Sequence, residues 1–517
     1  MKLTGRRIAW AVVVACALAL VAWAYLFHAR SEWALENYKK QLRASGEPLS
    51  VDQLLPRPID LESNGARIFH QAQSYLLLGN SLLNTNPPEA MVMVGPGKAM
   101  VGWQQPDLRE QGTNTWEQAE VELENEQQEL ELLEEIIEHP ALDFHLDYHQ
   151  GFTMLLPHLA PLKQASQRLK SAALCDLRRG DTARATTRIR AMLAIARGLG
   201  DERLVISQLV RIAIAHIALA ANWELLQSPA VTDAELAQLQ TEWMAVDFIT
   251  GAENALLMER AMGEQTAEDM RESSANYRAL MGMSSRGGGG SSGGWLDNFA
   301  REAAEKGKET MWRYAWASPD QLRGLQGKQV LVDALRKREA GAGFKTVFAY
   351  QEQKLTELGI QQRATNDDGM LFGGEDPRYL FTESVRALER LPHRLLLAEA
   401  ARQLLVTAMA LKRYQLRNGH YPDALASLQP EFLNGSPRDP VDGEPLRYKL
   451  QPDGTFLLYS IGEDGEDNGG DPLPATKNSN PRDETRFPWL KGRDLVWPTP
   501  ATEAEVLAHR ERLRGKR

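Results

Sequence analysis

The start of the chain constrains the fold more than any other segment. Residues Ile8 to Phe27 form an uninterrupted apolar run without a charged side chain. A helix of about 20 such residues is long enough to cross a hydrocarbon core about 30 Å thick. Trp10 and Trp23 lie near the ends of the run, where aromatic rings favour the membrane interface. The run therefore predicts a transmembrane helix.

Basic residues on the two sides of this run bear on its orientation. Lys2, Arg6 and Arg7 crowd the short N-terminal tail, whereas Arg30 and Lys39 are among the more widely spaced cations that follow. The side with the denser positive charge tends to remain in the cytoplasm. We therefore expect a single-pass protein of the bacterial inner membrane, with most of the chain in the periplasm.

Three other interpretations of the N-terminus remain open. Ala22-Trp23-Ala24 is typical of a signal-peptide cleavage site, so the segment is either cleaved or retained. Val13-Val14-Ala15-Cys16 is similar to a lipoprotein box, although the apolar run continues beyond the cysteine. Arg6-Arg7 is a twin arginine without the rest of an export signature. Each alternative also exports the body, so the expected location does not change.

The composition excludes some classes of partner and framework. The formal net charge of -10 argues against a nucleic-acid-binding protein, because phosphate neutralisation needs a basic surface. Of the two cysteines, Cys16 lies in the apolar run and Cys175 in a distant helical segment, so we expect no disulfide framework.

Changes in composition divide the chain into segments. We expect a cytoplasmic tail and anchor (1–30), a juxtamembrane helix with loops and an acidic helix (31–160), a helical core (161–283), a Gly/Ser linker (284–294), a helical segment (295–391), a small α+β module (392–471) and a polar tail (472–517). The expected fold class is mainly α.

Two helical regions precede the linker. Trp116 to Glu138 predicts one glutamate-rich helix, and we expect its charged face to be solvated. Apolar residues then recur at helical spacing on both sides of Gly180-Asp181, which predicts two helices joined by a tight turn. This helix pair resembles a tetratricopeptide unit, but solenoids need about three repeats for stability.

The stretch Leu204 to Leu226 is apolar almost all round. It contains Gln208, Arg211 and His216, and an arginine near the centre of a bilayer costs a few kcal/mol. We therefore expect a buried helix of the body, with His216 in the core, and not a second transmembrane span.

The C-terminal module begins with a long helix that should end at Asn418-Gly419. Two short strands are expected at Leu446–Leu450 and Thr455–Ser460, followed by a glycine- and aspartate-rich loop, Gly462–Asp471. We call this last segment the Gly-Asp loop.

The order of motifs in this module is informative. Tyr421-Pro422, Asp439-Pro440 and Ser460-x-Gly462-x-Asp464-Gly465 follow one another. The module resembles the C-terminal domain of the major pseudopilin, protein G, of type II secretion systems. The resemblance covers residues 397–471, and no prepilin-type leader precedes the apolar run.

The resemblance implies a calcium ion in the Gly-Asp loop. The loop offers hard oxygen ligands, which calcium prefers, and glycines that let the backbone curl. The candidate ligands are Asp464, Glu466, Asp467, Asn468 and Asp471. A solvated acidic turn is the alternative interpretation.

Catalytic signatures are missing from the sequence. No G-x-S-x-G elbow occurs, and Cys175 is expected to be a buried small residue. His145 and His149 would share one helix face but lack an HExxH pattern, so we expect ordinary surface residues. The first functional hypothesis is an envelope scaffold that binds other envelope proteins. The alternatives are an exported hydrolase with an unrecognised site and a component related to the secretion pseudopilus.

Overall fold

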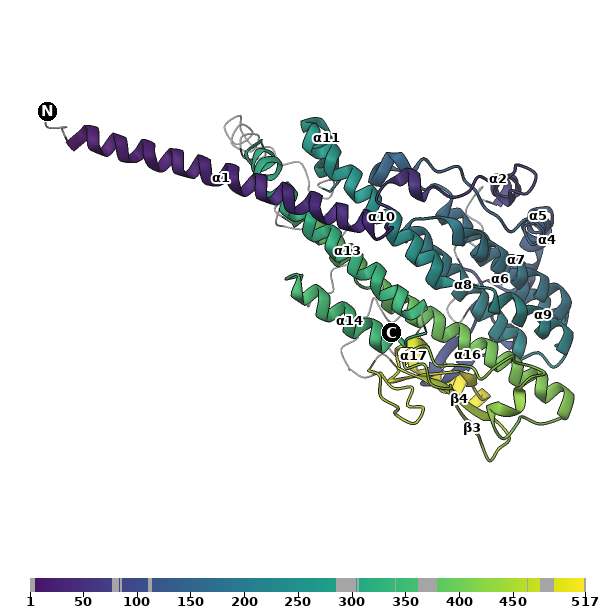
Figure 1. The fold of residues 1–517 in the computed structure, drawn as a ribbon. Helices are drawn as coiled ribbons and strands as arrows, with labels where there is room; N and C mark the ends of the chain where they lie inside the picture. The colour runs from purple at the N-terminus through teal and green to yellow at the C-terminus, as the bar shows by residue number, and fades with distance from the viewer. Residues whose placement is uncertain are drawn as a thin grey trace.

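The computed structural model describes residues 5–76, 83, 86–109, 114–284, 304, 306–339, 341–360, 379–462, 464–474 and 488–515. Most of this chain is helical, and its strands form two small three-stranded sheets. The helices lie side by side in a bundle, and one long helix projects from it (Figure 1). The expectation of a mainly α fold is confirmed.

The projecting helix, α1 (Gly5–Ala44), is continuous over 40 residues. The juxtamembrane helix is therefore not a separate element, because no glycine or proline lies between Ile8 and Ala44 to interrupt it. The expected boundary between residues 30 and 31 falls inside this helix. Its second half packs against α13 (Ala317–Glu339).

The remaining elements form the body. Its helices are α2 (Gly65–Leu76), α4 (Trp116–Asn125), α5 (Gln127–Glu135), α6 (Leu159–Arg179), α7 (Thr182–Gly198), α8 (Val205–Leu226), α9 (Asp233–Met244), α10 (Phe248–Glu272), α11 (Ser274–Ser284), α14 (Phe344–Glu357), α15 (Leu380–Leu388), α16 (Leu391–Asn418) and α17 (Glu503–Gly515). Short 3-10 helices include η2 (Gly102–Gln104) and η3 (Tyr148–Thr153), and η5 (Trp312–Trp316) is a π-helix. The predicted Gly/Ser linker lies outside the described residues, apart from Ser284.

Helices α6, α7 and α8 form the centre of the body. Gly180 ends α6 in a left-handed conformation (φ 82°), and the Asp181 side chain accepts a hydrogen bond from the Arg184 amide, so both predicted caps are confirmed. Helix α8 is apolar and long enough to cross a membrane, yet 67% of its most apolar window is buried in the body. His216 is buried on this helix, as expected, and burial lowers its pKa to about 4.

The predicted acidic helix differs from the structure in two ways. It breaks at Glu126 into α4 and α5. Several of its glutamates are also only partly exposed, and they form ion pairs with arginines of α6 and α7. These pairs include Glu122 with Arg168 at 2.7 Å and Glu120 with Arg179 at 3.0 Å. Sequence spacing identified the apolar stripe but not the basic helices that face the glutamates.

The C-terminal module has its predicted helix and strands. Gly419 ends α16 with φ 80°, and β3 (Arg447–Leu450) pairs antiparallel with β4 (Phe456–Ile461). One strand crosses the expected boundary between residues 471 and 472, because β5 (Asp494–Val496) from the predicted polar tail pairs with β4. The tail is therefore part of the module's sheet.

The second sheet was not predicted. The segment 31–160, in which only helices and loops were expected, contains a hairpin of β1 (Val92–Gly95) and β2 (Lys98–Met100). The tail strand β6 (Thr499–Pro500) pairs parallel to β2. Such pairing between distant segments leaves no periodic signal in a short, proline- and glycine-rich stretch.

Candidate functional sites

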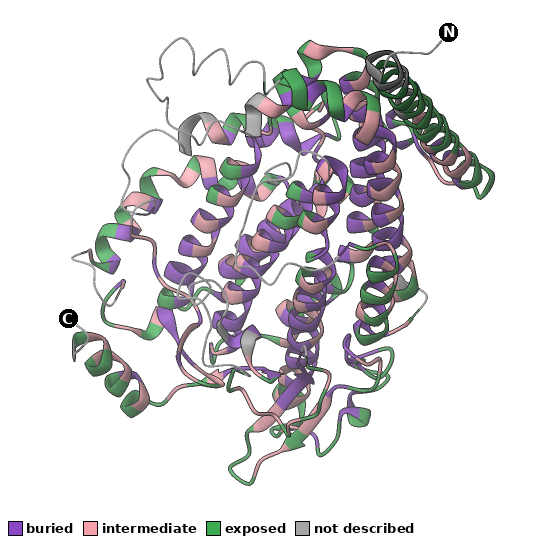
Figure 2. Ribbon diagram, turned by 90° about the vertical axis from the view of Figure 1, so that its left-hand side faces the viewer, coloured by how far each residue is buried: buried purple, intermediate pink, exposed green. Residues whose placement is uncertain are grey.

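The projecting half of α1 carries an uncovered apolar surface. Its exposed large apolar side chains are Trp10, Val12, Val13, Val14, Leu18, Trp23, Tyr25, Leu26 and Phe27. Figure 2 shows this helix mainly in the colour of exposed residues, in contrast to the buried faces of the bundle. Large contiguous apolar patches on proteins mark surfaces that contact a partner or a membrane.

The other half of α1 is attached to the body by a buried cation. Lys39 is 2% exposed, and its Nζ atom lies 2.9 Å from Glu264 and 3.0 Å from Glu268 of α10. Burial lowers the pKa of Lys39, but the two glutamates outweigh this effect and hold the pKa above its ordinary value. Leu35 and Leu42, on the same face of α1, pack beside Leu325 of α13.

A second ionic contact follows the end of α1. The Arg260 side chain is fully buried in α10, and it donates hydrogen bonds to Glu47 at 2.9 Å and to the Pro48 carbonyl at 2.7 Å. Glu47 also accepts from Arg336 of α13. Burial raises the pKa of Glu47, but the two arginines hold it below its ordinary value. Helix α1 and the chain that follows it are thus joined to the body by charged groups.

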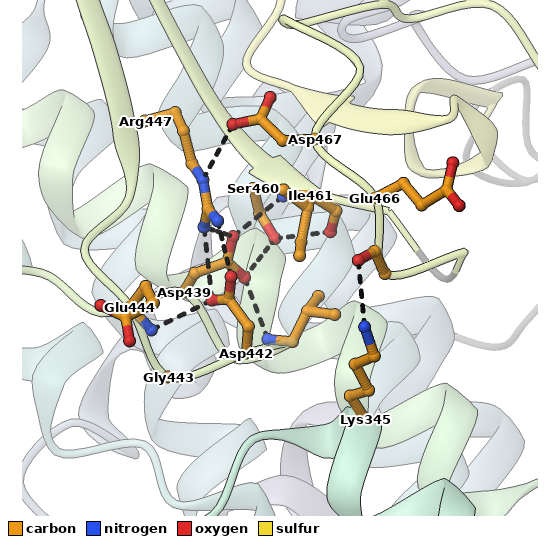
Figure 3. A network of polar contacts seen from close by, with 12 residues as sticks. Lys345, Asp439, Asp442, Gly443, Glu444, Arg447, Ser460, Ile461, Glu466 and Asp467 are labelled. Carbon is orange, nitrogen blue, oxygen red and sulfur yellow. Dashed lines mark hydrogen bonds and ion pairs between the residues drawn. The ribbon is translucent and has the colours of Figure 1, made fainter.

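The Gly-Asp loop contains the predicted calcium ligands. Asn468 donates hydrogen bonds to Asp464 at 3.2 Å and to the Glu466 carbonyl at 3.1 Å, so these residues lie together. The Glu466 carboxylate points away from the neighbouring charged cluster (Figure 3). Within the residues that the structure describes, no group of three or more His, Cys, Asp or Glu side chains is placed to hold a metal ion.

The two remaining candidate ligands are directed toward arginines. Asp467 accepts a hydrogen bond of 2.9 Å from the Tyr459 hydroxyl, and its other oxygen lies 3.5 Å from Arg447. Asp471 lies 3.5 Å from Arg493. The structure thus brings Asp464, Glu466 and Asn468 together, whereas Asp467 and Asp471 contact other partners.

A carboxylate of the sheet lies inside the loop. Asp494 on β5 is fully buried and accepts hydrogen bonds from the amides of Asn468, Gly470 and Asp471, at 3.3, 2.7 and 3.0 Å. Burial raises the pKa of Asp494, and these amides oppose that effect. The loop therefore presents backbone amides to an anion, and its own glycines permit this curl.

A second buried aspartate organises the module (Figure 3). Asp439 is fully buried, and it accepts hydrogen bonds from the Ser460 hydroxyl at 2.7 Å and the Ile461 amide at 2.9 Å. Arg447 lies 2.7 Å from Asp439 and 2.6 Å from Asp442. Asp439 and Ser460, which belong to the motifs of the module, thus support its structure.

A charged cleft of about 540 Å³ lies between α4–α5 and α6–α7. We call it the charged cleft. Its residues are Glu120, Leu123, Glu124, Gln127, Glu131, Glu134, Ala172, Cys175, Asp176, Arg179, Arg184 and Arg188. The α4–α5 wall carries acidic residues, and the α6–α7 wall carries all of its arginines.

The floor of the charged cleft is a buried ion triplet. Arg188 is 3% exposed; its Nε atom lies 2.6 Å from Asp176, and its Nη1 atom lies 3.3 Å from Glu134. Burial raises the pKa of both carboxyls, whereas Arg188 opposes the rise. Cys175 is buried beside them, and burial raises the pKa of its thiol to about 12, which disfavours the thiolate form at neutral pH.

Another buried carboxylate was missed in the sequence. Glu224 on α8 is fully buried and accepts hydrogen bonds from the amides of Met91 at 2.8 Å and Gly102 at 2.9 Å. Burial raises its pKa to about 7. Glu224 is the one acidic residue of α8, and this was the available signal in the sequence. Its hydrogen bonds attach the β1–β2 hairpin to the core.

The two histidines considered as zinc ligands do not share a helix. His145 has φ 53° and lies 3.3 Å from Asp143, while His149 lies 3.3 Å from Asp52. Both side chains are exposed, as expected for surface residues.

Lys39 was not identified from the sequence as a buried contact residue, although its spacing from Leu35 and Leu42 places it on their apolar face.

Comparisons with known proteins found no relative of this chain. No family model, curated protein or solved structure matches this chain.

Proposed function

We propose that this chain is a single-pass protein of the bacterial inner membrane, anchored by Ile8–Phe27, with its body in the periplasm. The uncovered apolar half of α1 carries the proposal, since water is a poor environment for nine large apolar side chains on one isolated helix. The basic residues before the run support a cytoplasmic N-terminus.

The proposed role of the anchored body is that of a scaffold for other envelope proteins. Helix α1 passes from its apolar half into the body without a break; Lys39 attaches the helix there, and Arg260 attaches the chain that follows it. The 17 residues from His28 to Ala44 span about 25 Å at 1.5 Å per residue. A rigid connection of this kind holds the body at a fixed height above the bilayer, which suits a protein that positions partners.

Membrane insertion is tested with arginine substitutions. Val14→Arg together with Leu18→Arg places two charges near the middle of the run, at a cost of about 2.5–3.5 kcal/mol each. We expect the full chain to leave the carbonate-resistant membrane fraction. Trp33→Arg, on an exposed position outside the run, is the control and should remain there. Equal membrane retention of the double variant contradicts the anchor.

Orientation is tested with reporters fused after Ser45. Alkaline phosphatase, which is active only after export, should be active there, and a reporter that functions only in the cytosol should be silent. The opposite pattern would overturn the periplasmic location.

An exported hydrolase is the second candidate. The raised pKa values of Glu134 and Asp176 in the charged cleft favour it, because general acids are often buried carboxyls. Both carboxyls are ion-paired with Arg188, however, and an ion-paired carboxylate is better suited to binding than to proton transfer.

We also propose that residues 392–471 form a pseudopilin-like module, and prepilin-type cleavage of the N-terminus would favour a role in a pseudopilus.

A further inference from the structure

The direction of α13 shows which elements lie at the end of the body from which α1 projects. Leu35 and Leu42 cluster with Leu325 of α13. Glu47, further along the chain, pairs with Arg336, further along α13, so the two helices run parallel. The π-helix η5 directly precedes α13 and contacts α1. It therefore lies at the end of the body that faces the apolar half of α1, where Figure 1 also shows α11.

Helix α10 reaches the same end from the opposite direction. Arg271 and Glu272 in its last turn line a groove together with Ala29 and Trp33 of α1. Trp33 follows Phe27, the last residue of the apolar run, by six residues, which is about 9 Å along a helix. The headgroup layer adds about 5–8 Å to each side of the hydrocarbon core. With the apolar run in the core, Trp33 and the end of α10 therefore lie at the height of the lipid headgroups.

The π-helix is attached to the end of α10. The Arg313 guanidinium donates hydrogen bonds to the Arg271 carbonyl and to the Ser274 hydroxyl, each at 3.0 Å. Trp312 is fully buried, whereas Tyr314 faces solvent. The exposed side of η5 thus lies beside the end of α10, at the same height as the headgroups.

Large apolar and aromatic side chains at this end are left uncovered by the body. Trp33 is 69% exposed, Met311 49% and Tyr314 66%. Tryptophan and tyrosine are enriched at membrane interfaces, where the ring is partly in lipid and its polar atom is in water. Together with Arg271 and Lys306, we call these three residues the anchor-side surface.

The charge of this end differs from that of the whole chain, which carries a formal net charge of -10. The described residues 271–281 and 306–316 contain more cations than carboxylates. These charged residues are Arg271, Arg278, Lys306, Lys308 and Arg313 against Glu272 and Glu309. The end of the body that faces the anchor is therefore locally basic, which is complementary to anionic lipid.

Ion pairs within the protein neutralise neighbouring carboxylates. Glu268, which also lines the groove, lies 3.0 Å from Lys39. Glu309 is buried and pairs with two of the arginines. In the described part of the chain, by contrast, neither Arg271 nor Lys306 has a carboxylate within 4 Å. These two cations are therefore available to phosphate groups of lipids.

We propose that the anchor-side surface rests on the lipid headgroups as a second membrane contact of the protein. Trp33, Met311 and Tyr314 enter the interface, and Arg271 and Lys306 contact lipid phosphates. Buried apolar area and attraction to anionic lipid both strengthen an interfacial contact of this kind. The contact fixes the tilt of the body on the bilayer, which one membrane helix alone does not. This inference rests on the proposed anchor, because α1 sets the height of the surface.

The test uses the full chain in lipid nanodiscs of phosphatidylcholine and phosphatidylglycerol. A nitroxide label at Tyr314→Cys is compared with labels at Leu18→Cys in the anchor and at Val121→Cys, an exposed position on α4 at the far end of the bundle (Figure 1). Cys16→Ser removes the exposed native thiol, and Cys175 is buried. The readout is the collision rate with oxygen, which concentrates in lipid, divided by the rate with a water-soluble nickel chelate.

We expect this ratio to be several-fold higher for the Tyr314→Cys label than for the Val121→Cys label, and highest for the Leu18→Cys label. Equal ratios at positions 314 and 121, with a high ratio at position 18, would overturn the second contact and leave the anchor intact. A ratio at position 18 as low as at position 121 would overturn the anchor and this inference together.

Substitutions test the two cations. Arg271→Gln combined with Lys306→Gln should lower the ratio of the Tyr314→Cys label in discs that contain phosphatidylglycerol. Added salt should have the same effect, because it screens exposed charges. Arg67→Gln removes an exposed cation from α2, outside this surface, and should leave the ratio unchanged. Thermal unfolding verifies that each variant folds. An unchanged ratio in the double variant would overturn the assignment of the lipid contact to Arg271 and Lys306.

Discussion

The Ser460 hydroxyl donates a hydrogen bond of 2.7 Å to Oδ1 of Asp439, and this bond joins β4 to the segment that precedes β3. Both residues belong to the motifs that resemble a pseudopilin module. The contact gives these motifs a structural explanation: a fully buried carboxylate fixes the sheet by binding a hydroxyl, two amides and an arginine.

Asp439→Asn should therefore destabilise the module. The asparagine has one acceptor oxygen where the aspartate has two, and it leaves the charge of Arg447 less compensated. We expect a loss of about 2–4 kcal/mol in the free energy of unfolding. Denaturant unfolding followed by tryptophan fluorescence measures the change. Glu444→Gln, an exposed neighbour, is the control, and an equal effect of the two substitutions would contradict the structural role of Asp439.

Gly102→Ala should detach the β1–β2 hairpin from the core. A Cβ atom at Gly102 would lie 2.1 Å from the Glu89 carbonyl oxygen and 3.2 Å from the Glu224 carboxylate. The hairpin has to move, which weakens the bond from the Gly102 amide to Glu224, and we expect a cost of about 2–4 kcal/mol. Gly95→Ala on the same hairpin meets open space and should change thermal stability little.

Calcium should not change the thermal stability of the protein if the Gly-Asp loop keeps the geometry described. Asp494 already accepts hydrogen bonds from three backbone amides of the loop, and the carboxylates of Asp467 and Asp471 are directed toward arginines. Thermal unfolding with calcium and with a chelator measures the effect. A calcium-dependent rise in the midpoint that Asp464→Ala abolishes would show that the loop rearranges and that the calcium prediction is right.

Local patterns in the sequence predicted local structure well. Gly180 and Gly419 end helices where expected. These signals depend on a few neighbouring residues, so no knowledge of distant segments is needed. The apolar period likewise identified α6, α7, α8 and α16.

Interactions between distant segments could not be predicted in this way. The strand β5 pairs with β4 across the expected module boundary, and Glu224 binds amides of a hairpin more than a hundred positions earlier. The charged cleft depends on which arginines of α6–α7 face the glutamates of α4–α5. A sequence shows that each helix is charged, but it does not show which faces meet.

Acid should weaken the attachment of the chain that follows α1. Arg336 and Arg260 hold the pKa of Glu47 below its ordinary value of 4.5, so Glu47 stabilises the fold above about pH 4.5 and this contribution is lost as the pH falls through its folded-state pKa. Thermal midpoints measured from neutral pH down to about pH 3 should fall less steeply below about pH 4.5 for Glu47→Gln than for the wild type. Parallel curves would exclude this ion pair as a source of the acid sensitivity.

Lys39 and Lys40 provide a matched pair for testing the docked anchor. Lys39→Ala leaves the buried Glu264 carboxylate without its cation, and breaking a buried ion pair costs about 3–5 kcal/mol. Hydrogen exchange in residues 31–44 should then accelerate, because α1 separates from α10. Lys40 is exposed, so Lys40→Ala should leave the exchange rates unchanged. Both variants retain the run Ile8–Phe27 and should remain in the membrane fraction. If exchange in residues 31–44 is equally slow in both variants, Lys39 does not hold the anchor to the body, and the apolar contacts of Leu35 and Leu42 suffice.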